Sequence, residues 1–264
     1  MERDEEMKDE QENMKAMAYL AHDFCSPLNA CAAALQMMRM IEENPSAEWE
    51  KYYRMISHNL HQMVRITDQY TSYYRLAHQD LSMTSRIVNI SDFLFQIHEG
   101  IQECFSEDVL QMKLDAAVGC LAVVDVCLLE QAFWNLITNS VQATKERPCK
   151  INVSVSCREE YVVLSVQDFG CGIEPDKQEK IFTPSYQTGV FRKGAGLGLP
   201  LVREIMDRHH GRVTLESRPG KGSTFSLWFP QAAKVEGGEK RLRQRGIAVD
   251  YCNKAQTELG DFLA

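Results

Sequence analysis

The sequence has no segment that would anchor it in a membrane or direct it out of the cell. No apolar run approaches the roughly 20 residues that are needed to cross a bilayer. The residues from Met1 to Glu6 are mainly acidic, whereas a secretory leader begins with a basic stretch followed by an apolar one. We therefore expect a protein that has no membrane span and works in the cytoplasm.

The sequence also lacks the usual signatures of zinc and nucleic-acid binding. None of its nine cysteines belongs to a Cys-x-x-Cys pair or has a companion histidine at a zinc-binding spacing. An odd number of cysteines in a chain without an export signal indicates reduced thiols. The net charge of −8 disfavours nucleic-acid binding, which requires a basic surface that displaces counterions.

Two helical patterns are present in the first third of the chain. Apolar residues recur at spacings of four and three along residues 14–38, and again along residues 53–74. Pro27 predicts a local bend in the first helix, and Ser46 can cap the second. A hairpin of two such helices buries only part of its apolar stripe. We therefore expect a homodimer in which two copies complete a four-helix bundle.

His22 lies one position past the apolar stripe of the first helix, so its ring should face solvent. An isolated histidine on a helix is most simply a surface residue. His22 differs because Asp23 follows it, and an exposed imidazole beside a carboxylate can act as a nucleophile.

After residue 77 the helical period ends, and mixed strands and helices follow. We predict helices over residues 93–105 and 127–144, and strands over residues 87–92, 121–124, 151–157, 161–167, 213–217 and 223–229. The expected fold class is α+β, in which a helical hairpin precedes an α/β sandwich. We divide the chain into an acidic segment (1–13), the hairpin (14–77), a linker (78–86), the sandwich domain (87–230) and a solvated, partly helical tail (231–264). His209, His210 and Gly211 suggest the end of a helix with a glycine cap.

Two glycine clusters, residues 168–173 and 194–199, predict a site for a polyanion. Glycine turns can direct successive backbone N–H groups at phosphate oxygens. Pro200 suits the first turn of a helix whose positive end would face the same phosphates. Asn135 and Asn139 share one face of a helix, where their amide oxygens could bind magnesium; the alternative is a polar face exposed to solvent.

Taken together, these segments closely resemble the catalytic half of bacterial sensor histidine kinases of the GHKL ATP-binding superfamily. Residues 135–140 resemble its N box, 168–173 its G1 box, 181–184 its F box, 194–199 its G2 box and 220–225 its last glycine motif. Residues 21–28 resemble the phosphoacceptor H box. Several motifs in the family's order are far more specific than any one glycine cluster.

The resemblance implies a role for each matching residue, with ATP and Mg²⁺ as the bound groups. Asp168 would accept a hydrogen bond from the adenine amino group, while Asn139 and Asn135 would hold Mg²⁺ and the phosphates. His22 would attack the γ-phosphorus, with Asp23 orienting or deprotonating its ring. Residues 174–193 would form a mobile lid. The remaining nucleotide-binding positions are Gly170, Gly172, Ile173, Phe182, Arg192, Lys193, Gly194, Gly196, Leu197, Gly198, Leu199 and Thr224.

The predicted function is an autophosphorylating histidine kinase that passes phosphate from His22 to an aspartate on a response-regulator receiver domain. GHKL ATPases carry a glutamate where this chain has Asn135, and an amide cannot act as a general base, which favours a kinase over a hydrolase. Ser26 stands where the family positions water for dephosphorylation of the partner. Two alternatives are a dimeric phosphorelay or scaffold protein with a relic ATP pocket, and a serine kinase of the anti-sigma type.

Overall fold

The structure is a computed structural model. It describes residues 24, 27–42, 44–77, 82–184, 186, 196–232, 251, 254, 255, 258, 259 and 263. In the described part of the chain, no helix combines the length and the apolar character that a membrane span requires.

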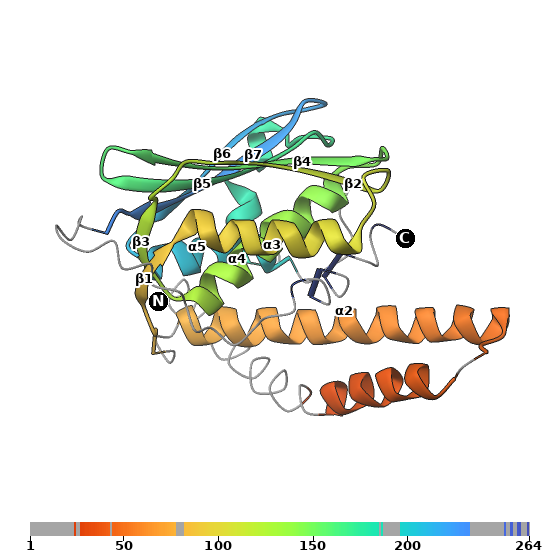
Figure 1. Cartoon of the computed structure of the whole chain (residues 1–264). Coiled ribbons are helices and arrows are strands. Elements are labelled where there is room, and N and C mark those ends of the chain that lie inside the picture. The colour runs from red at the N-terminus through yellow and green to blue at the C-terminus, as the bar shows by residue number, and fades with distance from the viewer. Residues whose placement is uncertain are drawn as a thin grey trace, which may run out of the picture.

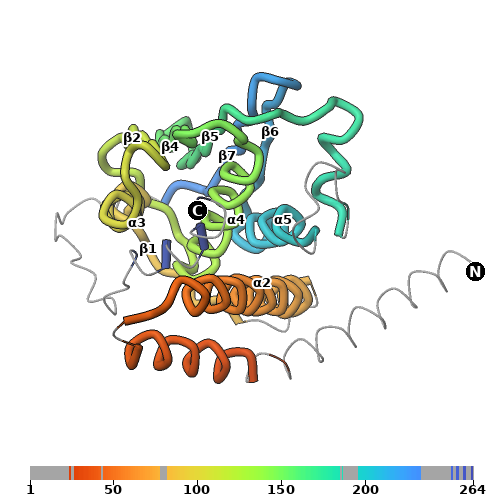
Figure 2. Tube along the Cα trace, turned by 90° about the vertical axis from the view of Figure 1, so that its right-hand side faces the viewer, coloured from red at the N-terminus to blue at the C-terminus, as the bar shows by residue number. Residues whose placement is uncertain are grey.

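The N-terminal region is a helical hairpin. Residues 27–41 are helical, and α2 (Ala47–Ala77) runs back beside them (Figures 1 and 2). The backbone N–H of Trp49 donates to Ser46 Oγ over 3.1 Å, which confirms the predicted cap. The expected bend at Pro27 depends partly on residues 25 and 26, which lie outside the described residues.

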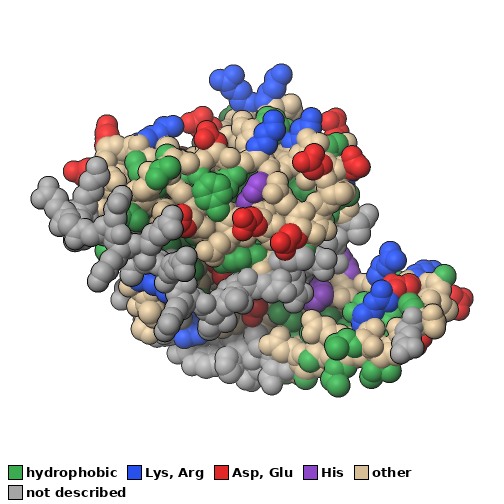
Figure 3. All heavy atoms as spheres, in the orientation of Figure 1, with side chains coloured by type: hydrophobic (Ala, Val, Ile, Leu, Met, Phe, Trp, Pro, Cys, Tyr) green, Lys and Arg blue, Asp and Glu red, His purple; other side chains and the backbone are tan. Residues whose placement is uncertain are grey.

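Much of the apolar stripe of this hairpin is exposed in the single chain. Of its members, Met38 is 52% exposed, Ile56 is 54% exposed and Met63 is 53% exposed. Hydrophobic side chains gather along the lower edge of the molecule, where the two helices lie (Figure 3). Such incomplete burial is the reason for expecting a homodimer, which stays a prediction.

The second region is a mixed sheet covered on one face by helices (Figure 1). Five strands lie in the order β2 (Leu110–Ala116), β4 (Cys149–Arg158), β5 (Tyr161–Asp168), β7 (Gly222–Pro230) and β6 (Arg212–Arg218). β2 and β4 are parallel, and the other neighbours are antiparallel. β1 (Arg86–Asn89) and β3 (Leu121–Val124) form a separate antiparallel pair. The α/β sandwich that the motifs implied is therefore the observed fold.

Three helices, α3 (Ile90–Cys104), α4 (Val126–Ala143) and α5 (Gly198–Arg208), cover the sheet. The core lies between these helices and the alternating inward residues of β4 and β5. Eleven of the 18 residues of α4 are buried, because the helix lies against the sheet on one side and contacts α5 on the other. Helix α2, called the stalk below, packs beneath α5 (Figure 2), so the hairpin and the sandwich domain are in direct contact.

The start of α3 differs from the prediction. Residues 87–92 were expected to be a strand followed by a helix from residue 93, but the helix begins at Ile90. Asn89 caps it, since Asn89 Oδ1 accepts a hydrogen bond from the backbone N–H of Ser91 over 3.1 Å. β2 was not predicted at all.

The C-terminal tail also differs from the prediction of a solvated appendage. Among its described residues, Ala255 and Leu259 are fully buried and Leu263 is 6% exposed, all within the main hydrophobic core. Their spacing of four residues places them on one face of a helix, which explains how a short tail can bury them together. The basic run of residues 240–245 lies outside the described residues.

The prediction that the cysteines are reduced thiols is wrong for Cys104, which is in a disulfide bond. Cys31, Cys120, Cys127, Cys149, Cys157 and Cys171 are free.

Candidate functional site

The buried carboxylate of Asp168 stands at the centre of the candidate site, at the end of β5. It is 3% exposed. Backbone N–H groups of Gly170 and Ser223 donate to its Oδ1 over 2.8 and 3.3 Å, so within the described residues Oδ2 is left for a ligand. Burial raises the pKa of Asp168 to about 6, against the lowering effect of hydrogen bonds from the backbone of Gly170, Ser223 and Asp168 itself. A desolvated acceptor held by two N–H groups is suited to a donor such as an exocyclic amine.

The glycines beside Asp168 serve close packing of backbone against backbone. Gly172 has a φ of +66°, and a Cβ there would lie 2.1 Å from the carbonyl oxygen of Arg218. Gly222 has a φ of +85°, and its Cβ would lie 2.1 Å from the carbonyl oxygen of Asp168 itself. These two glycines therefore let the β6–β7 turn close over the end of β5, an explanation that anion binding alone did not supply.

Three of the residues expected to bind the nucleotide, Ile173, Phe182 and Thr224, lie in three separate segments. The backbone N–H of Ile173 donates to Ser217 Oγ over 2.8 Å, which fixes the loop after Gly172. Thr224 is half-buried on β7, opposite Gln167 of β5. Phe182 is buried, with its ring edge-on to Phe225 and the Arg203 guanidinium 5.1 Å from its centroid.

The two asparagines of α4 have different surroundings. Asn135 Oδ1 accepts a hydrogen bond from Gln69 Nε2 of the stalk over 2.7 Å, and Asn135 Nδ2 donates to the carbonyl oxygen of Gln131 over 2.9 Å. Asn139 Nδ2, in contrast, is buried without a hydrogen-bond partner in the described part of the chain. Its amide could turn either its N–H groups toward phosphate oxygens or its oxygen toward a cation. Asn139 therefore fits a bound nucleotide and Mg²⁺, whereas Asn135 is already engaged by the stalk.

The second glycine cluster begins α5, as predicted. Leu197 is buried and Leu199 and Gly196 are half-buried, while Pro200 lies buried in the first turn. A Cβ at Gly198 would lie 3.1 Å from Asn135 Oδ1, so the start of α5 and the asparagine face of α4 meet. Gly194, Arg192 and Lys193 lie outside the described residues, and so do His22 and Asp23.

The first part of the expected lid is a folded part of the domain. Residues 175–177 and 180–182 form two short 3-10 helices, η1 and η2. Gln178 Nε2 donates to the carbonyl oxygens of Ile173 and Ser217 over 3.0 and 3.1 Å, and Ile181 is buried. These contacts anchor residues 174–184, and residues 187–195 lie outside the described part.

Two neighbours of the site were missed by sequence reasoning. Gln69 carries no sequence signal, because its partner Asn135 is 66 residues away. His209 caps α5, so the predicted helix end is confirmed, but its hydrogen bonds were not foreseen. Its Nδ1–H donates to the carbonyl oxygen of Ile205, and its Nε2 accepts from the backbone N–H of Asp125 over 2.9 Å. Both ring nitrogens are thus committed to the neutral form, and burial lowers the pKa of His209.

Asp125 joins three segments at the start of α4. Its Oδ1 caps the helix by accepting from Cys127 and Leu128, and its Oδ2 accepts from the backbone N–H of Thr84 in the linker over 2.8 Å. Together with His209, it fixes α4 relative to the end of α5.

Comparison with known proteins agrees with this geometry. Residues 125–233 match the family described as histidine kinase-, DNA gyrase B- and HSP90-like ATPases. The wider chain is similar to sensor histidine kinases.

Two curated relatives and one solved structure give the extent of the similarity. The chain is 29% identical over 241 residues to the adaptive-response sensory kinase SasA of Crocosphaera subtropica, covering 87% of this chain and 63% of SasA. It is 26% identical over 225 residues to the sensor histidine kinase RppB of Synechocystis, covering 83% of this chain and 49% of RppB. The chain therefore spans less than two thirds of either relative. Full-length ShkA in complex with AMPPNP shares the fold, with a TM-score of 0.66 at 23% identity over 83% of this chain and 46% of ShkA.

Proposed function

We propose that the protein is an ATP-dependent histidine kinase that phosphorylates its own His22 and passes the phosphate to an aspartate of a response-regulator receiver domain. The observation that carries this proposal is the presence of two groups in the domain: the buried carboxylate of Asp168, which can accept a hydrogen bond, and the side-chain amide of Asn139, whose nitrogen has no partner among the described residues. Asp168 has its Oδ1 fixed by two backbone N–H groups, and Asn139 has a buried Nδ2 without a partner among the described residues. The first suits an adenine amino group, and the second suits phosphate oxygens or their Mg²⁺.

The proposed reaction is a phosphoryl transfer in which the protein positions both reactants. A ring nitrogen of His22 forms a bond to the γ-phosphorus, and the bond from that phosphorus to its bridging oxygen breaks to release ADP. Asp23 accepts or orients the proton of the imidazole. Mg²⁺, held by Asn139 together with Asn135, would offset charge on the phosphates. Asn135 is an amide and cannot deprotonate water, which favours transfer to His22 over hydrolysis.

The helical hairpin supports the partner assignments. Its exposed apolar residues fit a homodimer in which the histidine of each copy lies on a four-helix bundle. A receiver domain would dock on the same bundle to reach the phosphohistidine.

Incubation of the full chain with Mg²⁺ and ATP labelled in its γ-phosphate tests the proposal. We expect a label that is stable in base and labile in acid, that is abolished by His22→Ala and Asn139→Ala, and that moves to a receiver domain. His58→Ala and His61→Ala are matched controls on the second helix of the same hairpin and should retain the label. An acid-stable label would indicate a serine kinase, and complete absence of label would indicate a scaffold with a relic pocket.

A further inference from the structure

The end of the chain is built into the contact between the stalk and the ATP-binding domain. The described residues of the C-terminal segment, 251, 254, 255, 258, 259 and 263, are helical and repeat at intervals that fall on one face of a helix. Ala255 and Leu259 are fully buried in the main core, which also contains Leu76 from the end of α2. Burial of this kind ties the segment to the domain through the hydrophobic effect.

Polar side chains of the same segment face both α2 and α4. Lys254 Nζ forms an ion pair with Glu130 Oε1 of α4 over 2.6 Å, and Glu130 is only 8% exposed. Glu258 lies partly buried beside Arg65 of α2; burial raises the pKa of Glu258, and the nearby charges of Arg65 and Lys254 oppose that rise. The negative charges of Asp68 and Glu130 also raise the pKa of Glu258, as burial does. The segment is therefore joined to the domain by an ion pair, and it brings a second charged residue near the charges of α2.

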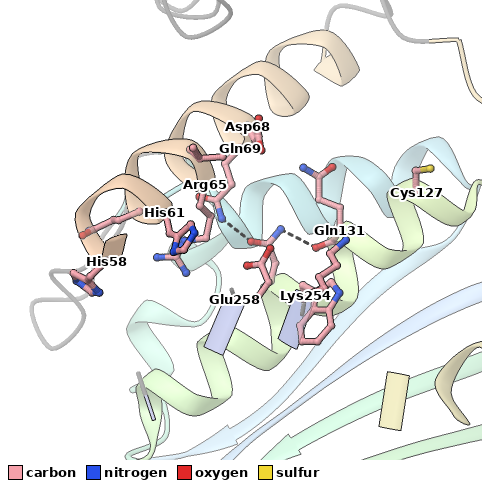
Figure 4. A pocket seen from close by; sticks show the side chains of 13 residues that line it. His58, His61, Arg65, Asp68, Gln69, Cys127, Gln131, Lys254 and Glu258 are labelled. Atoms are coloured by element: carbon pink, nitrogen blue, oxygen red, sulfur yellow. Dashed lines mark hydrogen bonds between the residues drawn. The ribbon is translucent and has the colours of Figure 1, made fainter. Parts of the chain in front are cut away.

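These residues line a cavity of roughly 280 Å³ at the stalk–domain contact. Figure 4 shows Arg65 and Gln69 reaching into it from α2, Gln131 from α4, and Lys254 and Glu258 from the C-terminal segment. Asn135 also lines it, with Oδ1 bonded to Gln69 of the stalk and Nδ2 bonded to the Gln131 carbonyl oxygen. The polar atoms of Asn135 are thus occupied while α2 lies against α4.

We infer that the C-terminal segment is an intramolecular latch that holds the stalk against α4 and keeps Asn135 engaged by Gln69. In this state Asn135 is withheld from phosphate and Mg²⁺. Release of the latch lets α2 and α4 separate and returns Asn135 to the nucleotide. The docking part of this inference stands on the contacts alone, and the inhibitory part rests on the proposed function.

Reversal of one charge in the full-length protein tests the latch. Lys254→Glu places two carboxylates side by side at Glu130 and should loosen the segment. Deuterium exchange of the amides of residues 60–77 should become faster, and the initial rate of histidine labelling should rise by about fivefold or more, as expected for a modest coupling. Lys150→Glu, which makes the same charge change at an exposed position on β4, should alter neither.

The double variant Glu130→Lys with Lys254→Glu restores an ion pair and should return both quantities toward those of the wild type. If Lys254→Glu reduces the helix content, the single variant is not properly folded and the test rests on the double variant. Amide exchange in the double variant as fast as in the single variant would then overturn the latch. Unchanged exchange in a folded Lys254→Glu protein also overturns it. If the wild type is labelled at a measurable rate, and Lys254→Glu speeds exchange without raising that rate, the inhibitory role is wrong. If the wild type takes no label while exchange responds as expected, the latch stands as a docking device and the proposed function fails.

Discussion

The side-chain amide of Gln69 on α2 donates to Asn135 Oδ1 on the sandwich domain over 2.7 Å. This hydrogen bond joins two parts of the chain that the sequence presents as separate domains. It also places the residue expected at the phosphates in contact with the stalk. The described structure is therefore one in which the domain is docked on α2, and the predictions below concern what holds that arrangement and what the site binds.

Replacement of Asp168 should selectively weaken nucleotide binding. Asp168→Asn keeps the shape but presents a neutral group to the adenine amine. Because hydrogen bonds to charged groups contribute about 1.5–3 kcal/mol, we expect ATP affinity to fall by about 10- to 100-fold in titration calorimetry with Mg²⁺. Asp115→Asn, at an exposed position on β2, should bind like the wild type. Equal affinity of the Asp168 and Asp115 variants would remove Asp168 from the site.

The same carboxylate should make binding depend on pH. Since burial raises the pKa of Asp168 to about 6, its charge is lost as the pH falls through that value, and ATP affinity should fall with it. The effect on folding stability has the opposite sign. Because the pKa of Asp168 is higher in the folded state, the folded protein takes up a proton at a higher pH than the unfolded chain does. This group therefore stabilises the fold increasingly as the pH falls from about 6 toward the pKa of the unfolded state. Asp168→Asn should remove the pH dependence of binding near 6.

His209 should make folding stability fall in mild acid. Its pKa is lowered by burial, and its Nε2 accepts from Asp125, so the folded state disfavours the proton that the unfolded state accepts. Its contribution is therefore present above the unfolded pKa of about 6.5 and is lost as the pH falls through that value toward the folded pKa. Denaturant unfolding of the wild type and His209→Gln should show this slope only in the wild type. Parallel curves would contradict it.

The C-terminal residues should contribute to global stability. Leu259 is fully buried, so Leu259→Ala should lower the free energy of unfolding by about 2–5 kcal/mol. Val118 is 98% exposed, and Val118→Ala should change it by less than about 0.5 kcal/mol. A value for Leu259→Ala as small as that for Val118→Ala would show that the tail does not pack in solution.

Two glycines with similar backbone angles separate conformational strain from steric clash. Gly172 and Gly220 have φ values of +66° and +71°, but only at Gly172 would a Cβ meet backbone, the Arg218 carbonyl oxygen. Gly220→Ala should cost about 1–2 kcal/mol of stability for the left-handed conformation alone. Gly172→Ala should cost clearly more, because the loop after β5 must move. Equal costs in thermal unfolding would mean that the β6–β7 turn yields easily.

Local sequence signals predicted most of the sheet. β3, β4, β5 and the β6–β7 hairpin lie within two residues of their predicted ends, because alternating apolar residues are bounded there by turn residues. β2 was missed although its residues, Leu110–Ala116, alternate between apolar and polar; its pairing partner β4 lies beyond an intervening strand and helix, so no neighbouring segment marked it as a strand. The start of α3 was misplaced because Asn89 competes with Ser91 and Asp92 as a cap.

Contacts between distant segments were outside the reach of sequence reasoning. The buried stripe of Ala255, Leu259 and Leu263 was visible as a helical spacing, but nothing local indicated that the core would accept it. The neutral state of His209 follows from its contact with Asp125, which is 84 residues away. The placement of the glycines near Asp168 at a ligand site stays a prediction, whereas the structure shows that they are needed for backbone packing at the β6–β7 turn.

The central claim is that ATP bound beside Asp168 phosphorylates one histidine of the helical hairpin, His22. Mass spectrometric mapping at neutral to basic pH, after incubation of the full chain with ATP and Mg²⁺, tests it most directly. We predict phosphate on His22, absent from the Asn139→Ala variant, and none on His58 or His61. Phosphate on another residue with His22 unmodified, or phosphohistidine that persists in Asn139→Ala, would contradict the account.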